Sequence, residues 1–130
     1  MIKALFVHLF TSLGALCGLF SLYFISVGEY RSMFILMLFS LIIDGVDGTL
    51  ARKLKINNKS NPLDGALLDN IIDYLNYVIV PAFFILVSPL VTSPLNFIIA
   101  GLITISSAYQ FTQVNAKTDD HYFLGFPDYW

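Results

Sequence analysis

The sequence predicts an all-α membrane protein, a polytopic helix bundle with four transmembrane helices. Two observations support this prediction. Of the 130 residues, 57% are hydrophobic and 12% are charged, whereas soluble chains average about 25% charged residues. The mean hydropathy is +0.75, and several apolar runs approach the length that crosses a hydrocarbon core of about 30 Å. A net charge of −2 argues against nucleic acid as a partner. The single cysteine, Cys17, excludes an intrachain disulfide.

Each predicted span has its own justification. Ala4–Val27 carries no formal charge and is too long for the apolar region of a signal peptide. Ser32–Ala51 reaches spanning length only when its Gly- and Asp-containing end is included, and Ala66–Val87 is polar early and apolar later. Leu95–Phe111 is uncharged and contains small residues, which let membrane helices approach closely. The connections are short, so we expect one domain over residues 1–130.

The basic residues predict the orientation in the membrane. With four spans and a cytoplasmic N-terminus, Arg31 alone of the seven basic residues falls outside, as the positive-inside rule requires. The loop 53–64 and the tail after Phe111 are then cytoplasmic. The seven basic residues are Lys3, Arg31, Arg52, Lys53, Lys55, Lys59 and Lys117.

Four aspartates lie on the predicted spans, although an Asp at the bilayer centre costs about 2.5 to 3.5 kcal/mol. Asp44 and Asp47 are three residues apart and Asp69 and Asp73 are four apart, so each pair shares a helix face. Both pairs lie at helix ends joined by one loop, which predicts that all four carboxylates meet. Such charges repel unless protons or cations intervene. Oxygen ligands suit Mg²⁺ or Mn²⁺, and two such ions can clamp a displacement at phosphorus.

Two other interpretations of the aspartates stay open. Each one, taken singly, could be a solvated interfacial acid at a helix end. Alternatively, the four could form the relay of an ion or proton transporter. A transporter predicts acids near the middle of the membrane, whereas these cluster at one face.

Small residues accompany the aspartates. Gly48 and Ala51 are one turn apart and leave a shallow groove that ends at Arg52, and Gly65 lies one turn before Asp69 on the same face. Such a groove suits a flat ring that bears a pyrophosphate. Plain helix packing is the alternative explanation for each small residue.

Together these residues resemble the signature of the CDP-alcohol phosphatidyltransferase family. Residues 44–52 read DGVDGTLAR, twelve residues follow, and residues 65–73 read GALLDNIID. All eight fixed positions of the pattern DxxDGxxAR…GxxxDxxxD are occupied. The long spacer, VHLFTSLGALCG in the first span and the final KTDDHYFLGFPDYW are similar to the family's bacterial subgroup that makes phosphatidylcholine.

The resemblance implies transfer of the phosphatidyl group from CDP-diacylglycerol to choline, with CMP as the second product. Sister enzymes that use serine, inositol or glycerol phosphate are the alternative. By matching position, Asp44, Asp47 and Asp69 would ligate two Mn²⁺ or Mg²⁺ ions. Asp73 would be the general base and would also contact a metal ion. The remaining implied contacts are to the CDP moiety, with Gly48, Ala51 and Gly65 bordering the cytidine and Arg52 near a phosphate.

Choline is a quaternary ammonium ion, for which aromatic rings are the usual host. Tyr77, one turn beyond Asp73, and Tyr109, near the cytoplasmic end of the fourth span, are weak candidates, because many aromatic residues pack in cores or membrane interfaces. Thr11 and His8 are equally weak, and we interpret His8 as an interfacial or packing residue rather than a metal ligand.

The resemblance also bears on location and extent. It implies a multi-pass protein of the bacterial inner membrane with its active site facing the cytoplasm. Family members have six or more spans, so we expect this chain to be the N-terminal part of a longer protein. The acceptor alcohol, the metal used in the cell and a homodimer are left open.

Overall fold

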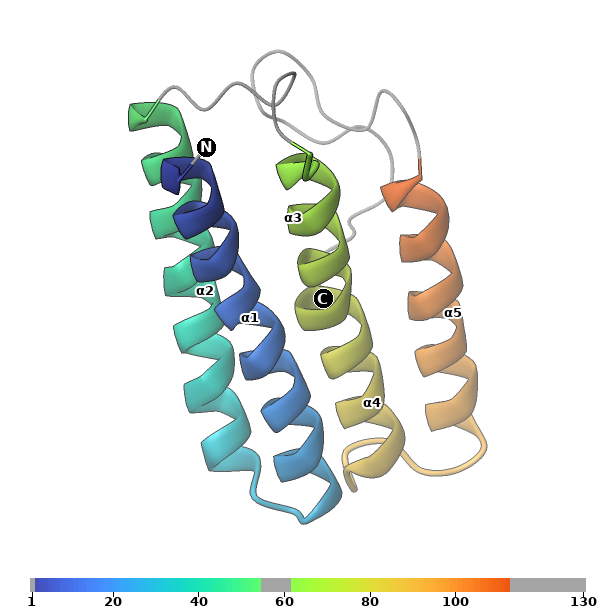
Figure 1. Ribbon diagram of the computed structural model, residues 1–130. Helices are drawn as coiled ribbons and strands as arrows, with labels where there is room; N and C mark the ends of the chain where they lie inside the picture. Colours follow the sequence, from blue (N-terminus) through green and yellow to red (C-terminus); the bar gives the residue numbers. More distant parts are fainter. Residues whose placement is uncertain (1, 55–61, 113–130) are drawn as a thin grey trace.

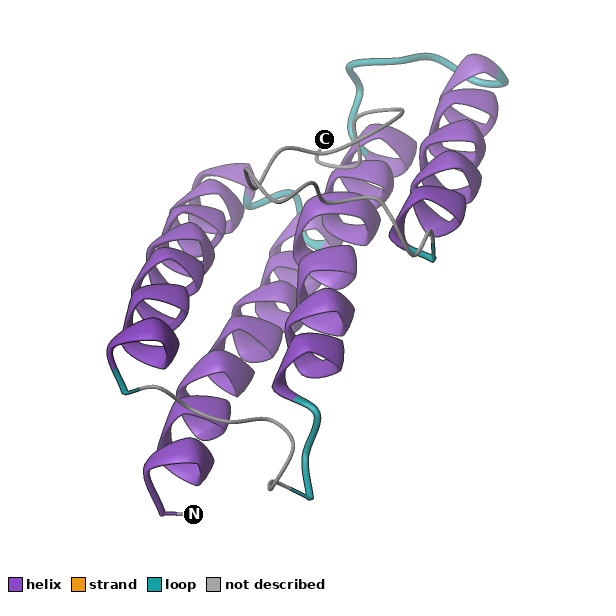
Figure 2. Ribbon diagram, turned by 90° about the horizontal axis from the view of Figure 1, so that it is seen from above, coloured by secondary structure: helices purple, strands orange, loops and turns teal. Residues whose placement is uncertain are grey.

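In the computed structural model, which describes residues 2–54 and 62–112, every regular element of the described chain is helical (Figures 1 and 2). The chain runs up and down, so that α1 begins, α2 ends, α3 begins and α5 ends at the same end of the bundle (Figure 1). We call this the motif end. The elements are α1 (Ile2–Ser26), α2 (Tyr30–Lys53), α3 (Gly65–Tyr74), the π-helix η2 (Leu75–Ile79), α4 (Val80–Val87) and α5 (Leu95–Phe111).

The predicted membrane helix bundle is confirmed. Three helices are long and apolar enough to cross a membrane, namely α1, α2 and the continuous rod Gly65–Val87 formed by α3, η2 and α4. The fourth predicted span, α5, has 17 residues and is about 26 Å long, which is shorter than the other three. The observed bounds differ from the predicted ones by at most two residues.

The side chains of α1 are distributed in the opposite sense to those of a soluble helix. Its outer face carries large apolar residues such as Leu5, Phe6 and Leu9, which are 60 to 66% exposed. Extensive exposed apolar surface of this kind requires an apolar surrounding, and small residues inside are typical of membrane helix packing. The buried face is small or polar at most positions, with Ala4, Val7, His8, Thr11, Gly14, Gly18, Ser21 and Ile25.

The helix α1 lies between the other two long elements. It packs closely along α2 and also against α3, η2 and α4, whereas α2 and α3 have little direct backbone contact with each other. Close approach depends on Gly14 and Gly18, because a Cβ at Gly18 would lie 2.8 Å from Leu75 Cδ2. Asn76 of η2 fastens the contact, since its amide donates to the Gly14 carbonyl at 3.0 Å and to the Ser40 hydroxyl. Thus α1 joins α2 to the rod formed by α3, η2 and α4.

Two turns are specified by single residues. Gly28 has a φ of 77°, and the Glu29 N–H donates to the Phe24 carbonyl at 2.8 Å, so α1 ends in a Schellman motif that requires glycine. At the motif end, Asp64 caps α3, because its carboxylate accepts from the N–H groups of Ala66 and Leu67 at 3.0 and 3.1 Å. This cap, one residue before Gly65, fixes the start of α3 at Gly65.

The third span contains a π-helical turn that the sequence analysis does not anticipate. The Val80 N–H donates to the Leu75 carbonyl, five residues earlier. Pro81 follows directly and has no N–H to offer the carbonyl four residues before it, where its ring would also clash. A single wide turn relieves this conflict, and such turns are frequent near functional sites. Here it places Asn76 and Tyr77 directly beyond Asp73.

Candidate active site

Three of the four predicted carboxylates converge. One oxygen from each of Asp44, Asp47 and Asp69 lies within 4.8 Å of the others. Asp44 and Asp47 come from α2 and Asp69 comes from α3. The limited contact between these two helices leaves the space in which the carboxylates meet. The two aspartate pairs therefore meet, as predicted, through these three residues.

The antiparallel course of α2 and α3 sets the depth of each carboxylate. At 1.5 Å per residue, Asp69 lies about 6 Å and Asp73 about 12 Å beyond the start of α3. Asp47 and Asp44 lie about 9 Å and 14 Å before the end of α2. The four aspartates therefore occupy one band near the motif end rather than the middle of the bundle, which does not favour a relay across the membrane.

Asp73 is the most deeply placed of the α3 pair and lies outside the group of three oxygens. It is 4% exposed, and Asp47 is 5% exposed. Asp73 lines a small cavity of about 10 Å³ that Asp44, Asp47 and Asp69 also line. This volume is near the minimum that holds one water molecule. The cavity therefore brings all four carboxylates to one small polar space.

The carboxylates fit a divalent cation. The Oδ2 atom of Asp47 is buried and accepts no hydrogen bond from any residue that the structure describes. A buried carboxylate oxygen without a partner is costly, and a hard cation is the ligand that carboxylate oxygens accommodate best. The chemistry of the three donors and this orphaned atom together support a metal-binding role for the cluster.

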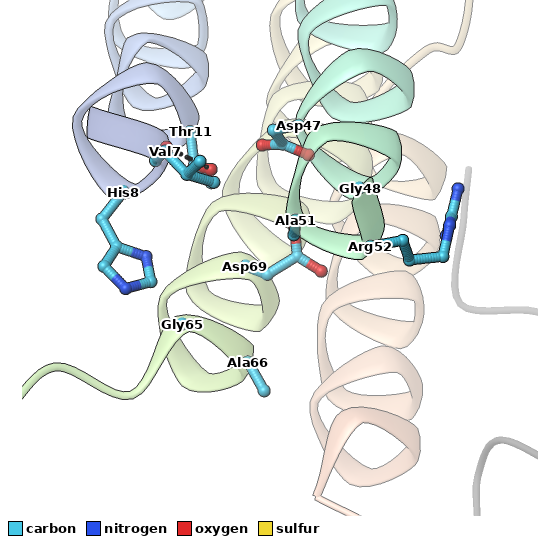
Figure 3. Close-up of a pocket in the computed structure, with 10 residues that line it drawn as sticks. All are labelled: Val7, His8, Thr11, Asp47, Gly48, Ala51, Arg52, Gly65, Ala66 and Asp69. Carbon is cyan, nitrogen blue, oxygen red and sulfur yellow. Dashed lines mark hydrogen bonds between the residues drawn. The ribbon is translucent and has the colours of Figure 1, made fainter. Parts of the chain in front are cut away.

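A larger cavity of about 390 Å³ opens beside the cluster at the motif end (Figure 3). Asp47 and Asp69 line it, together with residues that have little or no side chain, namely Gly48 and Ala51 on α2 and Gly65 and Ala66 on α3. A Cβ at Gly48 would meet only the Arg52 side chain, at 3.8 Å. The cavity lining comprises Val7, His8, Thr11, Asp47, Gly48, Ala51, Arg52, Gly65, Ala66 and Asp69.

Arg52 supplies positive charge at the edge of this cavity. Its side chain is exposed, and Nη2 donates to the Thr49 hydroxyl at 3.3 Å. Arginine has five N–H donors in a planar fork that matches phosphate oxygens. A cavity lined by both carboxylates and an arginine can hold an anionic ligand together with a cation.

Comparison with known proteins decides the family. The family model described as CDP-alcohol phosphatidyltransferase matches residues 5–123. The chain belongs to the CDP-alcohol phosphatidyltransferase family. The resemblance identified from the aspartate signature is therefore confirmed over nearly the whole chain.

Curated relatives in this family are named phosphatidylcholine synthase. The chain is 52% identical over 129 residues to the protein of Legionella pneumophila, covering 98% of this chain and 50% of that one. It is 45% identical over 130 residues to the protein of Borreliella burgdorferi, covering 100% and 56%, and 37% identical over 129 residues to that of Agrobacterium fabrum, covering 99% and 54%. The chain thus spans about half the length of these relatives. No solved structure gives a significant match.

Membership of the CDP-alcohol phosphatidyltransferase family, together with the apolar helices, is consistent with a multi-pass membrane protein.

Two of the residues named for choline lie in different surroundings. Tyr77 lines the small cavity with the carboxylates and also an apolar cavity of about 370 Å³ between α2 and α4. Tyr109 is 71% exposed on α5 and lines neither of these cavities nor the larger motif-end one, so its contact with choline stays a prediction.

Several residues that shape this site carried at most a weak functional assignment from the sequence. His8 is 7% exposed and lines the larger cavity, and Thr11 lines both polar cavities. Asn76, 1% exposed, lines the small cavity. The spacing Gly14-x-x-x-Gly18 within an apolar run is a sequence signal for close helix contact. The polar residues at positions 8 and 76 carried no comparable signal of their own.

Proposed function

We propose that the protein transfers the phosphatidyl group of CDP-diacylglycerol to choline and so makes phosphatidylcholine and CMP. The observation that supports this most is the convergence of Asp44, Asp47 and Asp69 beside a cavity bordered by Arg52, within a member of this family. The names of relatives at 35 to 52% identity support choline as the acceptor.

The residues of the motif end would bind the donor. Arg52 offers its guanidinium to the diphosphate, while the small residues Gly48, Ala51 and Gly65 leave room for the cytidine. Because the donor carries acyl chains, it must enter from the bilayer at the depth of its headgroup. The band of carboxylates about 6 to 14 Å from the helix ends suits that depth.

The carboxylates would hold Mn²⁺ or Mg²⁺, with two ions expected from four carboxylates. When bound, these ions supply positive charge that neutralises the diphosphate and the developing charge on the leaving phosphate. Asp44, Asp47 and Asp69 are the ligands we propose, because their oxygens lie within 4.8 Å of one another. Asp73, which shares the small cavity, could contact one ion in addition.

Asp73 is the proposed general base. A choline hydroxyl becomes a competent nucleophile when a base within hydrogen-bond reach accepts its proton. The choline oxygen then forms a bond to the phosphorus of the phosphatidyl group, the bond from this phosphorus to the bridging oxygen breaks, and CMP leaves with that oxygen. The proton stays on Asp73 until it passes to solvent. Catalysis of this kind relies on positioning and charge stabilisation.

Tyr77 is the better placed of the two proposed choline contacts. It lies between the carboxylates and an apolar cavity, so its ring could face the trimethylammonium group while the hydroxyl of choline points toward Asp73. Tyr109 is retained as a weaker candidate.

The orientation in the membrane is part of the proposal. Lys3, Arg52 and Lys53 lie in the motif-end turns, and Arg31 lies at the opposite end, which supports a cytoplasmic motif end in the bacterial inner membrane. Residues 1–130 would belong to one transmembrane domain, and a homodimer stays a prediction.

Phosphatidyl transfer by membranes that contain the whole gene product tests the proposal. The expected result is formation of a choline lipid and an equal amount of CMP from CDP-diacylglycerol and choline with Mn²⁺. An inactive Asp44→Asn protein, expressed at the same level, is the control. CMP release with serine, inositol or glycerol phosphate, but not with choline, would assign a sister activity instead. The absence of CMP release with every acceptor would refute the proposal.

A further inference from the structure

His8 is a buried polar side chain without a protein partner. It is 7% exposed, and its Nε2 atom makes no hydrogen bond to any residue within the described ranges. Buried polar atoms are paired in the great majority of cases. His8 also lines the larger motif-end cavity, on the wall formed by α1. The side chain that carries this buried, unpaired nitrogen is therefore part of the cavity wall.

The position of the imidazole ring is determined by Gly65. A Cβ on Gly65 would lie 2.6 Å from Cε1 and 3.2 Å from Nδ1 of His8, so the ring occupies the space that any other residue would fill. Figure 3 shows the ring beside the first turn of α3. Gly65 is thus needed to seat His8, in addition to the role that the family signature suggests. Packing holds the ring in place and leaves its Nε2 atom without a protein partner.

The level of His8 along the bundle indicates which part of the donor it meets. It packs against Gly65, four residues or about 6 Å nearer to the motif end than Asp69. In the proposed binding mode the acyl chains point into the bilayer and the diphosphate lies at the carboxylates and Arg52. The nucleoside then extends toward the motif end, at the level of His8.

We propose that His8 Nε2 forms a hydrogen bond to the nucleoside of the cytidine diphosphate donor and thereby orients it in the cavity. This inference rests on the proposed function and adds a substrate-binding residue that lies outside the aspartate signature. The imidazole can serve as donor or acceptor at Nε2, and both cytosine and ribose present complementary groups. The interpretation of His8 as a packing residue makes the opposite prediction, because packing requires only the ring.

Two substitutions separate hydrogen bonding from packing. His8→Phe keeps a ring against Gly65 but removes both nitrogens, whereas His8→Gln places an amide nitrogen near the position of Nε2. The matched control is Leu9→Phe, which adds the same side chain at the neighbouring position on the outer face, where Leu9 is 66% exposed. The whole gene product in membranes is assayed for the KM of CDP-diacylglycerol, the KM of choline and kcat. Inhibition by CMP is compared with inhibition by inorganic pyrophosphate.

We expect His8→Phe to raise the KM of the donor and the inhibition constant of CMP about tenfold, with the KM of choline and pyrophosphate inhibition unchanged. His8→Gln should recover most of the CMP affinity, and Leu9→Phe should match the wild type. Inhibition by 2′-deoxy-CMP and by UMP then identifies the group that His8 contacts. The analogue that lacks this group should inhibit the wild type and His8→Phe equally.

Unchanged CMP inhibition in His8→Phe would overturn the inference, as would equal weakening of CMP and pyrophosphate, which indicates a general disturbance of the cavity. If His8→Phe does not fold, His8→Asn replaces it, since its shorter amide does not reach the position of Nε2. Equal CMP affinity in the Asn and Gln variants would then refute the inference. A wild-type protein that neither turns over nor binds CMP would refute the proposed function itself.

Discussion

The contact between Gly18 and the π-helical turn provides a quantitative test of the packing. A Cβ at position 18 would lie 2.8 Å from Leu75 Cδ2 and closer still to Asn76 Oδ1. Asn76 cannot move away without weakening its hydrogen bonds to Gly14 and Ser40. We therefore predict that Gly18→Ala forces α1 away from η2 and destabilises the bundle.

The size of the effect follows from the contacts involved. Overpacking of a filled interior costs about 1 to 3 kcal/mol, and each weakened hydrogen bond adds about 0.5 to 1.5 kcal/mol. The better helix propensity of alanine returns about 1 kcal/mol. For two weakened hydrogen bonds the net destabilisation is about 1 to 5 kcal/mol, centred on about 3 kcal/mol, which corresponds to a decrease in Tm of about 6 to 12 °C for a protein of about 150 to 250 residues.

Thermal unfolding of the whole gene product in detergent measures this change. Gly101→Ala is the matched control, because a Cβ at Gly101 on α5 meets no atom within 4 Å, and its Tm should equal or exceed that of the wild type. Phosphatidyl transfer should also fall in Gly18→Ala, since Asn76 lines the small cavity with Asp73 and Tyr77. A Gly18→Ala protein as stable as Gly101→Ala would show that the α1–η2 contact is wrongly described.

Three further predictions concern the candidate site. Asp47→Asn and Asp69→Asn should each lower CMP release at least about 100-fold. The control Asp64→Ser, which keeps a helix cap, should leave CMP release near the wild-type rate. Equal losses in all three variants would argue against a specific role for the cluster. Chelation with EDTA should abolish phosphatidyl transfer and added Mn²⁺ or Mg²⁺ should restore it; full activity after exhaustive chelation would exclude the metal role. Asp73→Asn should lower kcat about 10² to 10⁴-fold with little change in the KM of the donor, and a change confined to that KM would assign Asp73 to donor binding instead.

Much of the fold was predictable because membrane spans are encoded by length and composition. The four predicted ranges lie within two residues of the observed helices, and the order of the connections places both aspartate pairs at one end. The central position of α1 was not predictable in this way. The interior face of α1 is marked by small and polar residues, including the spacing of Gly14 and Gly18, rather than by the apolar stripe of a soluble helix. These residues identify a face suited to helix contact, but not which helices it contacts.

The candidate site, too, was predictable only where the spacing of residues in the sequence determines the geometry. The signature from Asp44 to Asp73 identifies the carboxylates, because their spacing alone places each pair on one helix face. His8 and Asn76 depend on tertiary contacts, with Gly65 for the first and with Gly14 and Ser40 for the second. Pro81 could have indicated an irregular turn, but neither its type nor its effect on Asn76 follows from the sequence.

The arrangement of α1 has a consequence for how genes of this family are recognised. Every residue of the family signature lies on α2 or α3, yet both helices are aligned by a neighbour that contributes none of those residues. A duplicated gene that has lost its function could therefore retain an intact signature, while a bulky residue at position 14 or 18 of its product separates the α2 part of the signature from the α3 part. A genome search for active enzymes should therefore check the size of the side chains in α1 as well as the presence of the aspartates in α2 and α3.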